Sequence, residues 1–255
     1  MKIVGIIPAR MESSRYFGKP LKEICGMPMI GHVYHRSNLC DLLSDVYVAT
    51  CNNEINNYVS SINGKVVMTS NSHERATDRV AEALLNIEED LGEKIDIVVM
   101  IQGDEPMIFP NMISDGIKPL MKDHKLGVTN LMSVIKSKSD WEDPNEVKVV
   151  VNDRNFAMYF SREPIPSNKK YDGRIGAFKQ VCIISFKRDH LLQYCNLQPT
   201  PLEIIESVDM NRLLESGIGI KMVLTDINTY AVDTEKELKH VSNLMKNDKL
   251  MKIYL

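Results

Sequence analysis

Short apolar runs alternate with amphipathic segments through the first hundred residues of the chain. Apolar runs of this length indicate strands, and segments with a helical repeat of apolar positions indicate helices. Residues 95–101 are almost continuously apolar, as in a strand that is covered on both faces. The expected strands are residues 2–7, 45–49, 65–68 and 95–102, and the expected helices lie near residues 28–39, 53–61 and 77–89. This order of elements predicts an α/β fold with a mostly parallel sheet.

The pattern changes at about residue 126, where strands separated by polar turns replace the regular alternation. The expected elements are strands at 128–134, 147–151, 157–161 and 179–186, helices at 187–196 and 202–215, and strands at 220–224 and ending at Val232-Asp233. Thr234 and Glu237 form a capping box, which predicts that a last helix begins there. Because the chain has no repeat, low-complexity tract or linker, we expect a single domain over residues 1–255. Its mixed, β-rich extension is expected at approximately 128–186.

The composition is that of an ordinary globular protein and excludes several functions. Charged residues make up 25% and hydrophobic residues 44% of the chain, and the formal net charge is −3. Proteins that bind nucleic acid or anionic membranes generally need a basic surface, so neither partner is expected. The N-terminal apolar run is too short for a signal peptide, and no run approaches the ~20 apolar residues of a membrane span. Together with scattered cysteines that lack a C-x-x-C pattern, these features predict a cytoplasmic protein.

The first expected strand runs into a polar loop, residues 8–20, that is suited to holding a polyphosphate. Its cations are Arg10, Arg15 and Lys19. These cations supply charge-assisted hydrogen bonds, and small side chains let backbone N–H groups approach the phosphates. The loop is not a Walker A motif, because Pro20 follows Lys19, and it is not a dinucleotide fingerprint, because Gly18 is the one glycine in the turn. The residues alone leave two interpretations open, a phosphate-binding loop and a solvated basic loop.

Two aspartates follow expected strands and are candidate ligands of a metal ion. Asp104 lies in a Gln-Gly-Asp-Glu-Pro turn after a buried strand, and Asp233 lies where another strand is expected to end. Mg²⁺ typically takes one or two carboxylates together with substrate phosphates, so this pair suits it. The alternatives are that Asp104 forms the turn before Pro106, and that Asp233 interacts with the dipole of the last helix.

Further polar residues at expected strand and helix ends are candidates for binding a ligand. Thr77-Asp78-Arg79 opens a helix, so the alternative is that Thr77 or Asp78 is only its N-cap. The amide of Gln102 offers both a donor and an acceptor and could hydrogen-bond a ligand. A strand-end glutamine in a backbone turn is the alternative for this residue.

Three charged residues of the second half are candidates for binding an anionic ligand with hydroxyl groups. The guanidinium of Arg162 follows a strand and could clamp a carboxylate bidentately, unless it forms a surface salt bridge. Glu203 and Glu206 share one face of an expected helix and could both contact hydroxyl groups of a ligand. Two glutamates in a first helical turn are equally ordinary partners of the helix dipole.

Motifs spread over almost the whole chain resemble one enzyme family, the CTP:3-deoxy-manno-octulosonate (Kdo) cytidylyltransferases, or CMP-Kdo synthetases. The motifs are Ala9-Arg10-x-x-Ser13-Ser14-Arg15-x-x-Gly18-Lys19-Pro20-Leu21, Met68-Thr69-Ser70 to Thr77-Asp78-Arg79, Gln102-Gly103-Asp104-Glu105-Pro106, Tyr159-Phe160-Ser161-Arg162-x-Pro164-Ile165-Pro166, Pro201-Leu202-Glu203-x-x-Glu206 and Val232-Asp233-Thr234. They occur in family order. The resemblance implies a Rossmann-like nucleotidyltransferase fold and transfer of CMP from CTP to the anomeric hydroxyl of a 3-deoxy-2-ulosonic acid, with release of pyrophosphate.

The resemblance also implies roles for individual residues. The catalytic residues would be Arg10, Lys19, Asp104 and Asp233, with Mg²⁺ held by Asp104 and Asp233. The nucleotide would be bound by Ala9, Arg10, Ser14, Lys19, Ser70, Thr77, Asp78, Arg79 and Gln102, and the sugar by Arg162, Gln180, Glu203 and Glu206. The family further implies a homodimer formed through the β-rich lobe, and a product that feeds lipopolysaccharide or capsule synthesis.

The chain departs from the family pattern at four places, two of which are expected to contact the sugar. The departures are Tyr16-Phe17, Arg75-Ala76, Gln180-Val181-Cys182 and Ile204. A lost amide at Ile204 would leave hydrogen-bonding groups of the usual sugar unpaired. Another acceptor, such as 8-amino-Kdo, a nonulosonic acid or a phosphonate, is therefore the alternative to Kdo. A non-catalytic nucleotide sensor is a further alternative, against which the retention of both metal-binding aspartates argues.

Overall fold

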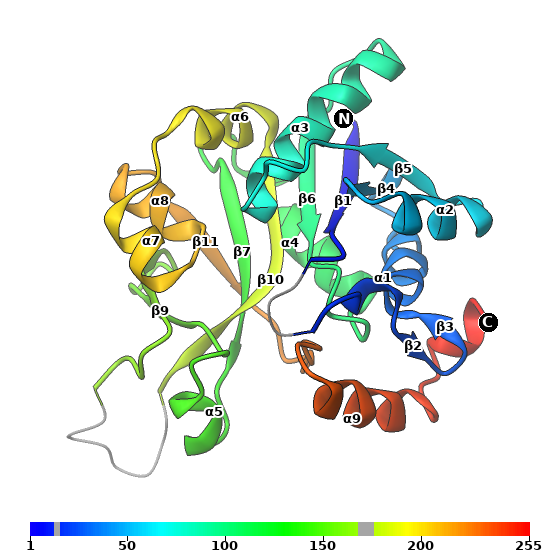
Figure 1. Ribbon diagram of the computed structural model, residues 1–255. Coiled ribbons are helices and arrows are strands. Elements are labelled where there is room, and N and C mark those ends of the chain that lie inside the picture. Colours follow the sequence, from blue (N-terminus) through cyan, green and yellow to red (C-terminus); the bar gives the residue numbers. More distant parts are fainter. Residues whose placement is uncertain (13–15, 168–175) are drawn as a thin grey trace. The chain divides into compact units, whose positions relative to one another are not determined.

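The computed structural model describes residues 1–12, 16–167 and 176–255 (Figure 1). The described chain forms two compact units, of which the first is Met1–Ser114 with Thr229–Leu255 and the second is Asp115–Asn228. The division falls inside helix α4 (Pro110–Lys122). A single domain over residues 1–255 stays a prediction, since one domain can contain two compact units.

The first unit contains four parallel strands in the order β6-β1-β4-β5. They are β1 (Ile3–Ala9), β4 (Asp45–Thr50), β5 (Lys65–Met68) and β6 (Ile97–Ile101). All residues of β1 and β6 are buried, as their continuous apolar sequences predict. The predicted α/β fold with a mostly parallel sheet is confirmed. An antiparallel pair that was not expected, β2 (Glu23–Ile24) and β3 (Met27–Pro28), follows the first loop.

The expected helices of the first unit form close to their predicted bounds. They are α1 (Met29–Asn38), α2 (Asn53–Ser61), α3 (Ala76–Leu91) and α9 (Glu235–Met245), with the short 3₁₀ helices η1 (Lys19–Leu21) and η2 (Met251–Ile253). Helix α1 packs against β1 and β4, α2 against β4 and β5, and α3 against all four parallel strands. Because these four strands are parallel, their carboxyl ends share one edge of the sheet.

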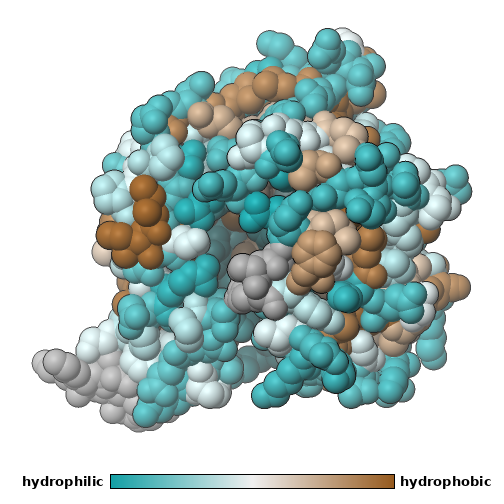
Figure 2. Space-filling view, viewed as in Figure 1, coloured by the Kyte–Doolittle hydropathy of each residue, from teal (hydrophilic) through white to brown (hydrophobic). Residues whose placement is uncertain are grey.

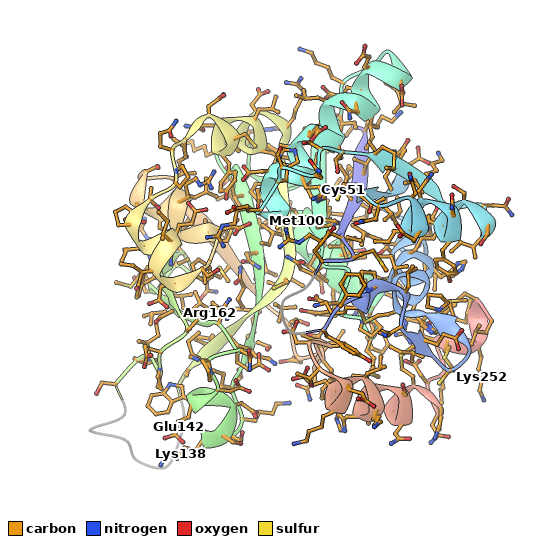
Figure 3. All side chains as sticks on the ribbon, in the orientation of Figure 1. Cys51, Met100, Lys138, Glu142, Arg162 and Lys252 are labelled. Carbon is orange, nitrogen blue, oxygen red and sulfur yellow. The ribbon has the colours of Figure 1, made fainter. Side chains whose placement is uncertain are left out.

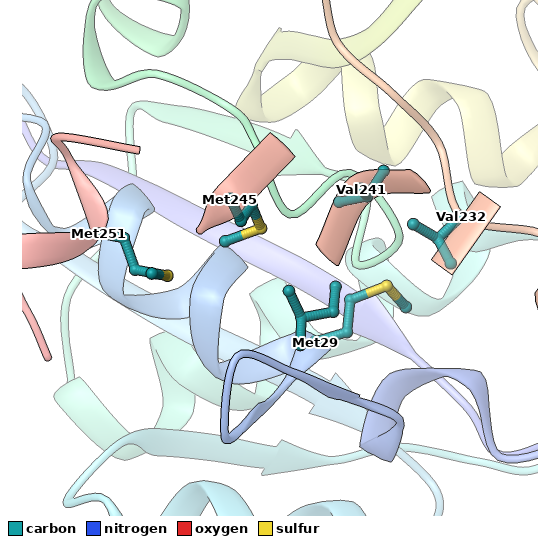
Figure 4. Close-up of a cluster of buried hydrophobic side chains, with 6 residues drawn as sticks. Met29, Val232, Val241, Met245 and Met251 are labelled. Carbon is teal, nitrogen blue, oxygen red and sulfur yellow. The ribbon is translucent and has the colours of Figure 1, made fainter. Parts of the chain in front are cut away.

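A separate hydrophobic cluster attaches the C-terminal segment to the beginning of the chain. Buried Ile24 and Met29 pack with Val241 and Met245 of α9. Val232 and Met251 complete the buried part of this cluster (Figure 4). The cluster explains why residues after Thr229 belong to the first unit although more than a hundred residues separate them from it in sequence.

The second unit is built on a mixed sheet, as predicted for the region after residue 126. Its strands are β7 (Val128–Val134), β8 (Lys148–Val151), β9 (Ala157–Ser161), β10 (Phe178–Lys187) and β11 (Ile220–Leu224). Strand β7 pairs antiparallel with β10 and parallel with β11, while β8 pairs antiparallel with β10 and β9. The helices of this unit are α5 (Lys138–Glu142), α6 (Arg188–Asn196), α7 (Pro201–Glu206) and α8 (Met210–Glu215).

Two of the expected elements were wrong, and further elements besides β2 and β3 were missed. The single helix expected at 202–215 is two helices, because Ser207 adopts a left-handed conformation (φ 51°) that ends α7. The strand expected to end at Val232-Asp233 does not form, since residues 225–233 are neither helix nor strand. Helix α4 was missed, and it carries Pro119 in its interior, a residue that usually signals a helix break.

No helix in the described parts of the chain has the length and apolar character needed to cross a membrane.

Candidate active site

Loops that follow the parallel strands gather the candidate residues of the first unit at the carboxyl edge of the sheet, where ligands of open α/β sheets bind. The loop after β1 is closed on itself, because the Gly18 N–H donates to the Met11 carbonyl at 3.0 Å. The Met11 N–H in turn donates to Asn52 Oδ1 at 3.0 Å, which ties the loop to the end of β4. Gly18 has a φ of 71°, a conformation that favours glycine, and η1 starts at the next residue, Lys19. The predicted nucleotide contact Ser14 lies outside the described residues.

The side chain of Lys19 lies between two carboxylates. Its Nζ donates to Asp104 Oδ2 at 2.7 Å and to Asp233 Oδ1 at 2.8 Å. The side chains of Lys19, Asp104 and Asp233 are 14%, 26% and 15% exposed, so all three are largely shielded from water. Burial opposes the charged form of the lysine, but the two carboxylates outweigh burial and raise the pKa of Lys19. Three of the four residues predicted to be catalytic, each from a separate motif, therefore meet at one point.

Backbone contacts bring the two aspartates together from opposite parts of the sequence. The Val232 N–H donates to the Asp104 carbonyl at 2.9 Å, which places the following residue beside the turn after β6. That turn lies close to β1, because a Cβ on Gly103 would be 3.1 Å from the Pro8 carbonyl oxygen. The Asp233 N–H donates to Glu237 Oε2 at 2.7 Å. Glu237, which the sequence predicted only as part of a helix cap, therefore also holds the backbone of a candidate metal ligand.

Helix α3 fastens the loop that joins it to β5. Buried Arg79 donates to Thr69 Oγ1 at 2.5 Å and to the Ser70 carbonyl at 3.1 Å. One turn later, the carboxylate of Glu82 accepts from the Ser70 N–H at 3.0 and 3.1 Å and pairs with His73. Sequence reasoning missed Glu82. Its spacing of three residues from Arg79 on one helix face was the available signal.

The remaining nucleotide candidates lie at the ends of the same elements. Thr77 is buried in the first turn of α3, where its hydroxyl lies 3.8 Å from the sulfur of Met100 (labelled in Figure 3). The N-cap of α3 is Arg75, so the alternative that Thr77 or Asp78 caps the helix was wrong. Ala9 is buried at the end of β1 and Arg10 after it is exposed, while Asp78 and Gln102 are half-buried.

In the second unit, Arg162 and Glu206 form hydrogen bonds to each other and to neighbouring residues. The guanidinium of Arg162 (labelled in Figure 3) donates to the Glu206, Pro144 and Ser207 carbonyls at 2.8, 2.9 and 3.3 Å. The Glu206 carboxylate accepts from the Arg162 N–H and from the Tyr159 and Ser161 hydroxyls, each at 2.7 Å. Burial opposes ionisation of this carboxyl group, but the hydrogen bonds outweigh burial and lower its pKa. Among the described residues, the guanidinium of Arg162 bonds to backbone carbonyls, and both its role as a sugar ligand and the alternative of a surface salt bridge stay predictions.

The other two sugar candidates of the second unit also have partners within the protein. Glu203 forms a bidentate pair with Arg212, with Oε2 2.7 Å from Nε and Oε1 2.6 Å from Nη2, and both residues are buried. Gln180 donates to Asn130 Oδ1 at 2.6 Å. Asn130 in turn donates to the Val181 and Ile183 carbonyls where the register of β10 shifts, so this side chain satisfies the irregular backbone. Gln180, which departs from the family pattern, thus hydrogen-bonds the residue that pairs with the irregular backbone of β10.

The carboxylate pair of the first unit fits a divalent cation that is completed by other ligands. Among the described residues, no group of three or more histidine, cysteine, aspartate or glutamate side chains could hold a metal alone. Asp104 and Asp233 nevertheless converge on one cation, the ammonium group of Lys19. Two carboxylates with room for phosphate oxygens and water are the donor set that Mg²⁺ usually takes.

Comparison with known proteins assigns the chain to a family. The family model described as cytidylyltransferase matches residues 4–227. The 3-deoxy-manno-octulosonate cytidylyltransferase of Geobacter metallireducens is 42% identical over 251 residues, with 94% of this chain and 96% of the relative covered. That of Fusobacterium nucleatum is 39% identical, with 98% and 99% covered.

Solved structures agree with this assignment. A structure of CMP:2-keto-3-deoxy-manno-octonic acid synthetase complexed with CTP has a TM-score of 0.88 at 39% identity, covering 96% of this chain and 99% of that one. A putative glucose-1-phosphate thymidylyltransferase from Bacillus anthracis, 17% identical with a TM-score of 0.65, shares the fold. The resemblance that the motifs indicated is confirmed, and the chain belongs to the cytidylyltransferase family.

Proposed function

We propose that this nucleotidyltransferase transfers CMP from CTP to the anomeric hydroxyl of 3-deoxy-manno-octulosonate and releases pyrophosphate. The observation that carries the proposal is the convergence of Lys19, Asp104 and Asp233 at the carboxyl edge of the parallel sheet. The names of the relatives, which are about 40% identical over nearly their full lengths, supply the two substrates.

The reaction is an in-line displacement at the α-phosphorus of CTP. The anomeric oxygen of the sugar forms the new bond, the bond to the bridging oxygen of the leaving pyrophosphate breaks, and the proton of the hydroxyl passes to the surrounding solvent or a base. Negative charge spreads over the phosphate oxygens as this happens. Arg10 and Lys19 would neutralise that charge and orient the triphosphate.

The charge at the site supports a requirement for a divalent cation. Lys19 contributes one positive charge and the two aspartates contribute two negative charges, so this group alone would repel a triphosphate. Asp104 and Asp233 would hold Mg²⁺, which when bound would supply Lewis-acid stabilisation of the charge on the phosphates. Magnesium dependence is therefore part of the proposal.

The loop between β5 and α3 would recognise the nucleotide. Its backbone is held by Arg79 and Glu82, so it is preformed for a ligand. Ser70 in this loop, Gln102 after β6, and Thr77 with Asp78 at the start of α3 would contact cytosine and ribose. Such a site loses little conformational freedom when CTP binds.

The acceptor proposed is Kdo itself, although the chain departs from the family pattern at Gln180 and Ile204. Gln180 is bonded to Asn130 in the second unit, which gives that departure a structural account. Ile204 is 60% exposed on α7, so its side chain is not part of a closed polar pocket in this unit. Arg162, Gln180, Glu203 and Glu206 are kept as candidate sugar contacts.

A homodimer, the family arrangement, is also proposed for this chain. Large apolar side chains are exposed in the second unit, with Met158, Ile204 and Ile205 at 61%, 60% and 75%. Figure 2 shows hydrophobic side chains gathered over α7 on an otherwise largely hydrophilic face. Exposed apolar groups of this kind are common where proteins associate. Light scattering at micromolar concentration should give the mass of a dimer, and a monomer mass would remove this part of the proposal.

The test of the function is pyrophosphate release from CTP and Kdo with Mg²⁺, with the product identified by its mass. UTP in place of CTP tests the base, and omission of Mg²⁺ tests the cation. A panel of 8-amino-Kdo, nonulosonic acids and phosphonates should react more slowly than Kdo. If one of these compounds reacted faster than Kdo, that compound would be the acceptor in place of Kdo. Tight CTP binding without turnover of any acceptor would instead identify a nucleotide sensor and reject the proposal.

A further inference from the structure

Lys19 occupies the position that a metal ion would need. Its Nζ is within 2.8 Å of an oxygen of each carboxylate of the pair, and these are the groups proposed to ligate the divalent cation. An ammonium group has three N–H donors and no acceptor, so at least two of its donors are used here. A cation that entered this pair would have to displace the ammonium group from both oxygens.

The lysine also compensates the repulsion between the two aspartates. Carboxylates brought to one point disfavour each other's ionisation unless a cation lies between them. The side chains are largely shielded from water, so the attraction to Lys19 is screened less than it would be on the surface. The ammonium group of Lys19 therefore already supplies a cation to both carboxylates.

The position of Lys19 in the chain gives its ammonium group an alternative partner. Lys19 begins η1 directly after the loop that is proposed to hold the triphosphate, and it carries its charge on a flexible four-carbon stem. When phosphates are present, the ammonium group can exchange carboxylate oxygens for phosphate oxygens and remain paired. Without phosphates, leaving the carboxylates would cost the lysine its partners.

We infer that Lys19 keeps divalent cations out of the Asp104–Asp233 pair until nucleotide phosphates draw its ammonium group away, so that the cation and CTP bind cooperatively. The inference rests on the proposed function, because it assumes that this pair is the cation site of the reaction. By linkage, the coupling is reciprocal: the cation must increase the affinity for CTP by the factor by which CTP increases the affinity for the cation.

The test measures Mn²⁺ binding to the protein without nucleotide, from the loss of the electron paramagnetic resonance signal of free Mn²⁺. Wild-type protein should bind Mn²⁺ weakly, and no more tightly than Asp233→Asn does. Lys19→Met should bind one Mn²⁺ at least tenfold more tightly than wild type. Lys19→Met combined with Asp233→Asn should lose this gain, which assigns the gained site to the carboxylate pair.

A matched control changes the same charge nearby. Lys22 lies three residues further on, and its Nζ is over the ring of Tyr16, 5.3 Å from the centroid. Lys22→Met should bind Mn²⁺ as wild type does, and an equal gain in this control would overturn the inference as a general charge effect. Lys19→Gln, which is neutral but can still donate hydrogen bonds, serves if Lys19→Met does not fold, and it should show the same gain.

Two further outcomes would overturn the inference. One is Mn²⁺ binding by Lys19→Met or Lys19→Gln that is no tighter than by wild type. The other is wild-type protein that binds Mn²⁺ tightly without nucleotide and loses it with Asp233→Asn. Turnover of CTP and Kdo by wild type is measured separately. Normal turnover without the gain in Mn²⁺ affinity rejects only this inference, whereas absent turnover rejects the proposed function.

Discussion

At the scale of single residues, the same charged groups can serve the ligand or the fold, and contacts separate the two. Asp104 and Asp233 share the ammonium group of Lys19 at the carboxyl edge of the sheet, where ligands of open α/β sheets bind. Glu206 instead accepts three hydrogen bonds within its own unit. Buried carboxylates bonded in this way stabilise the structure that contains them.

The first prediction concerns Asp233. Asp233→Asn should lower kcat on the order of 100-fold or more, the effect of removing one group that stabilises developing charge. The loss should be the same for every acceptor, and the KM for CTP should change much less. Steady-state rates of pyrophosphate release measure both constants. Glu235→Gln, a charge change at a fully exposed position on the same segment, should leave them unchanged. A loss confined to one acceptor would contradict the proposed metal role.

The second prediction concerns Glu206, whose pKa is lowered in the folded protein. Glu206→Gln should lower the free energy of unfolding by about 1–3 kcal/mol at pH 7, because hydrogen-bond donors lose a charged acceptor. A folded pKa below the unfolded value of 4.5 means that the stabilisation is present above pH 4.5 and is lost as pH falls through the folded pKa. The difference between wild type and variant should therefore narrow below about pH 4.5.

Urea unfolding at pH 7, 5 and 3.5 checks this second prediction. Glu163→Gln removes a nearby exposed carboxylate and should have the stability of wild type at each pH. A difference between wild type and Glu206→Gln that stayed constant down to pH 3.5 would show that ionisation of Glu206 does not contribute.

At the scale of elements, helix ends determine where the candidate residues lie. Helix α9 begins directly after Asp233, with Thr234 Oγ1 accepting from the Glu237 N–H at 3.3 Å. The carboxylate of Glu237 reaches one residue beyond the cap and bonds the Asp233 N–H instead of that of Thr234. The capping box was predicted from sequence, but its partner is the backbone of the candidate metal ligand.

The third prediction tests this arrangement with two variants of Glu237. Glu237→Ala removes the acceptor for the Asp233 N–H and should raise the Mg²⁺ concentration for half-maximal activity about 10–100-fold, as loss of a group that orients a metal ligand does. Glu237→Gln retains an acceptor oxygen and should restore most of the loss. Activity is measured across a Mg²⁺ titration at saturating CTP. Equal losses in the two variants would assign the effect to charge and not to positioning.

At the scale of the molecule, the end of the chain is anchored in the first unit by a buried polar network as well as by apolar packing. Arg36 is fully buried and pairs with Asp248, and it also donates to the Tyr254 hydroxyl at 3.0 Å and the Ile108 carbonyl at 3.2 Å. Burial opposes ionisation of Asp248, but the pair with Arg36 outweighs it and lowers the pKa of this carboxyl group. His32 bonds the same hydroxyl at 2.9 Å. The network holds the segment that follows α9.

The fourth prediction follows from the burial of this pair. Arg36→Met should lower the free energy of unfolding by about 3–5 kcal/mol, because it leaves the carboxylate of Asp248 buried without its cation. Arg36→Met with Asp248→Asn should be less destabilised than the sum of the single variants, since the pair is coupled. Urea unfolding of wild type, the two single variants and the double variant gives the free energies of this double-mutant cycle. Lys252→Met, at an exposed position of the same segment, is the control, and strictly additive effects would show that the pair is not coupled.

The sequence by itself determined the elements and the family. Strands β5, β7 and β9 and helix α2 begin and end where the apolar pattern predicts. The reason is that the spacing of apolar residues within one element is a local property of the sequence. The loop after β1, the Gln-Gly-Asp-Glu-Pro turn and Val232-Asp233-Thr234 were recognised as motifs before their positions in space were known. Failures occurred where a single backbone conformation decided the outcome, as at Ser207 between α7 and α8.

Only the tertiary structure decided which partner each charged residue has. Lys19 and Asp233 are 214 positions apart, and a bond from Val232 to the turn after β6 brings them together. The bonds of Arg162 to backbone carbonyls and of Glu82 to the Ser70 N–H likewise depend on where separate elements meet. A hydrogen bond is decided by a few tenths of an ångström, whereas residue type and spacing specify only which bonds are possible.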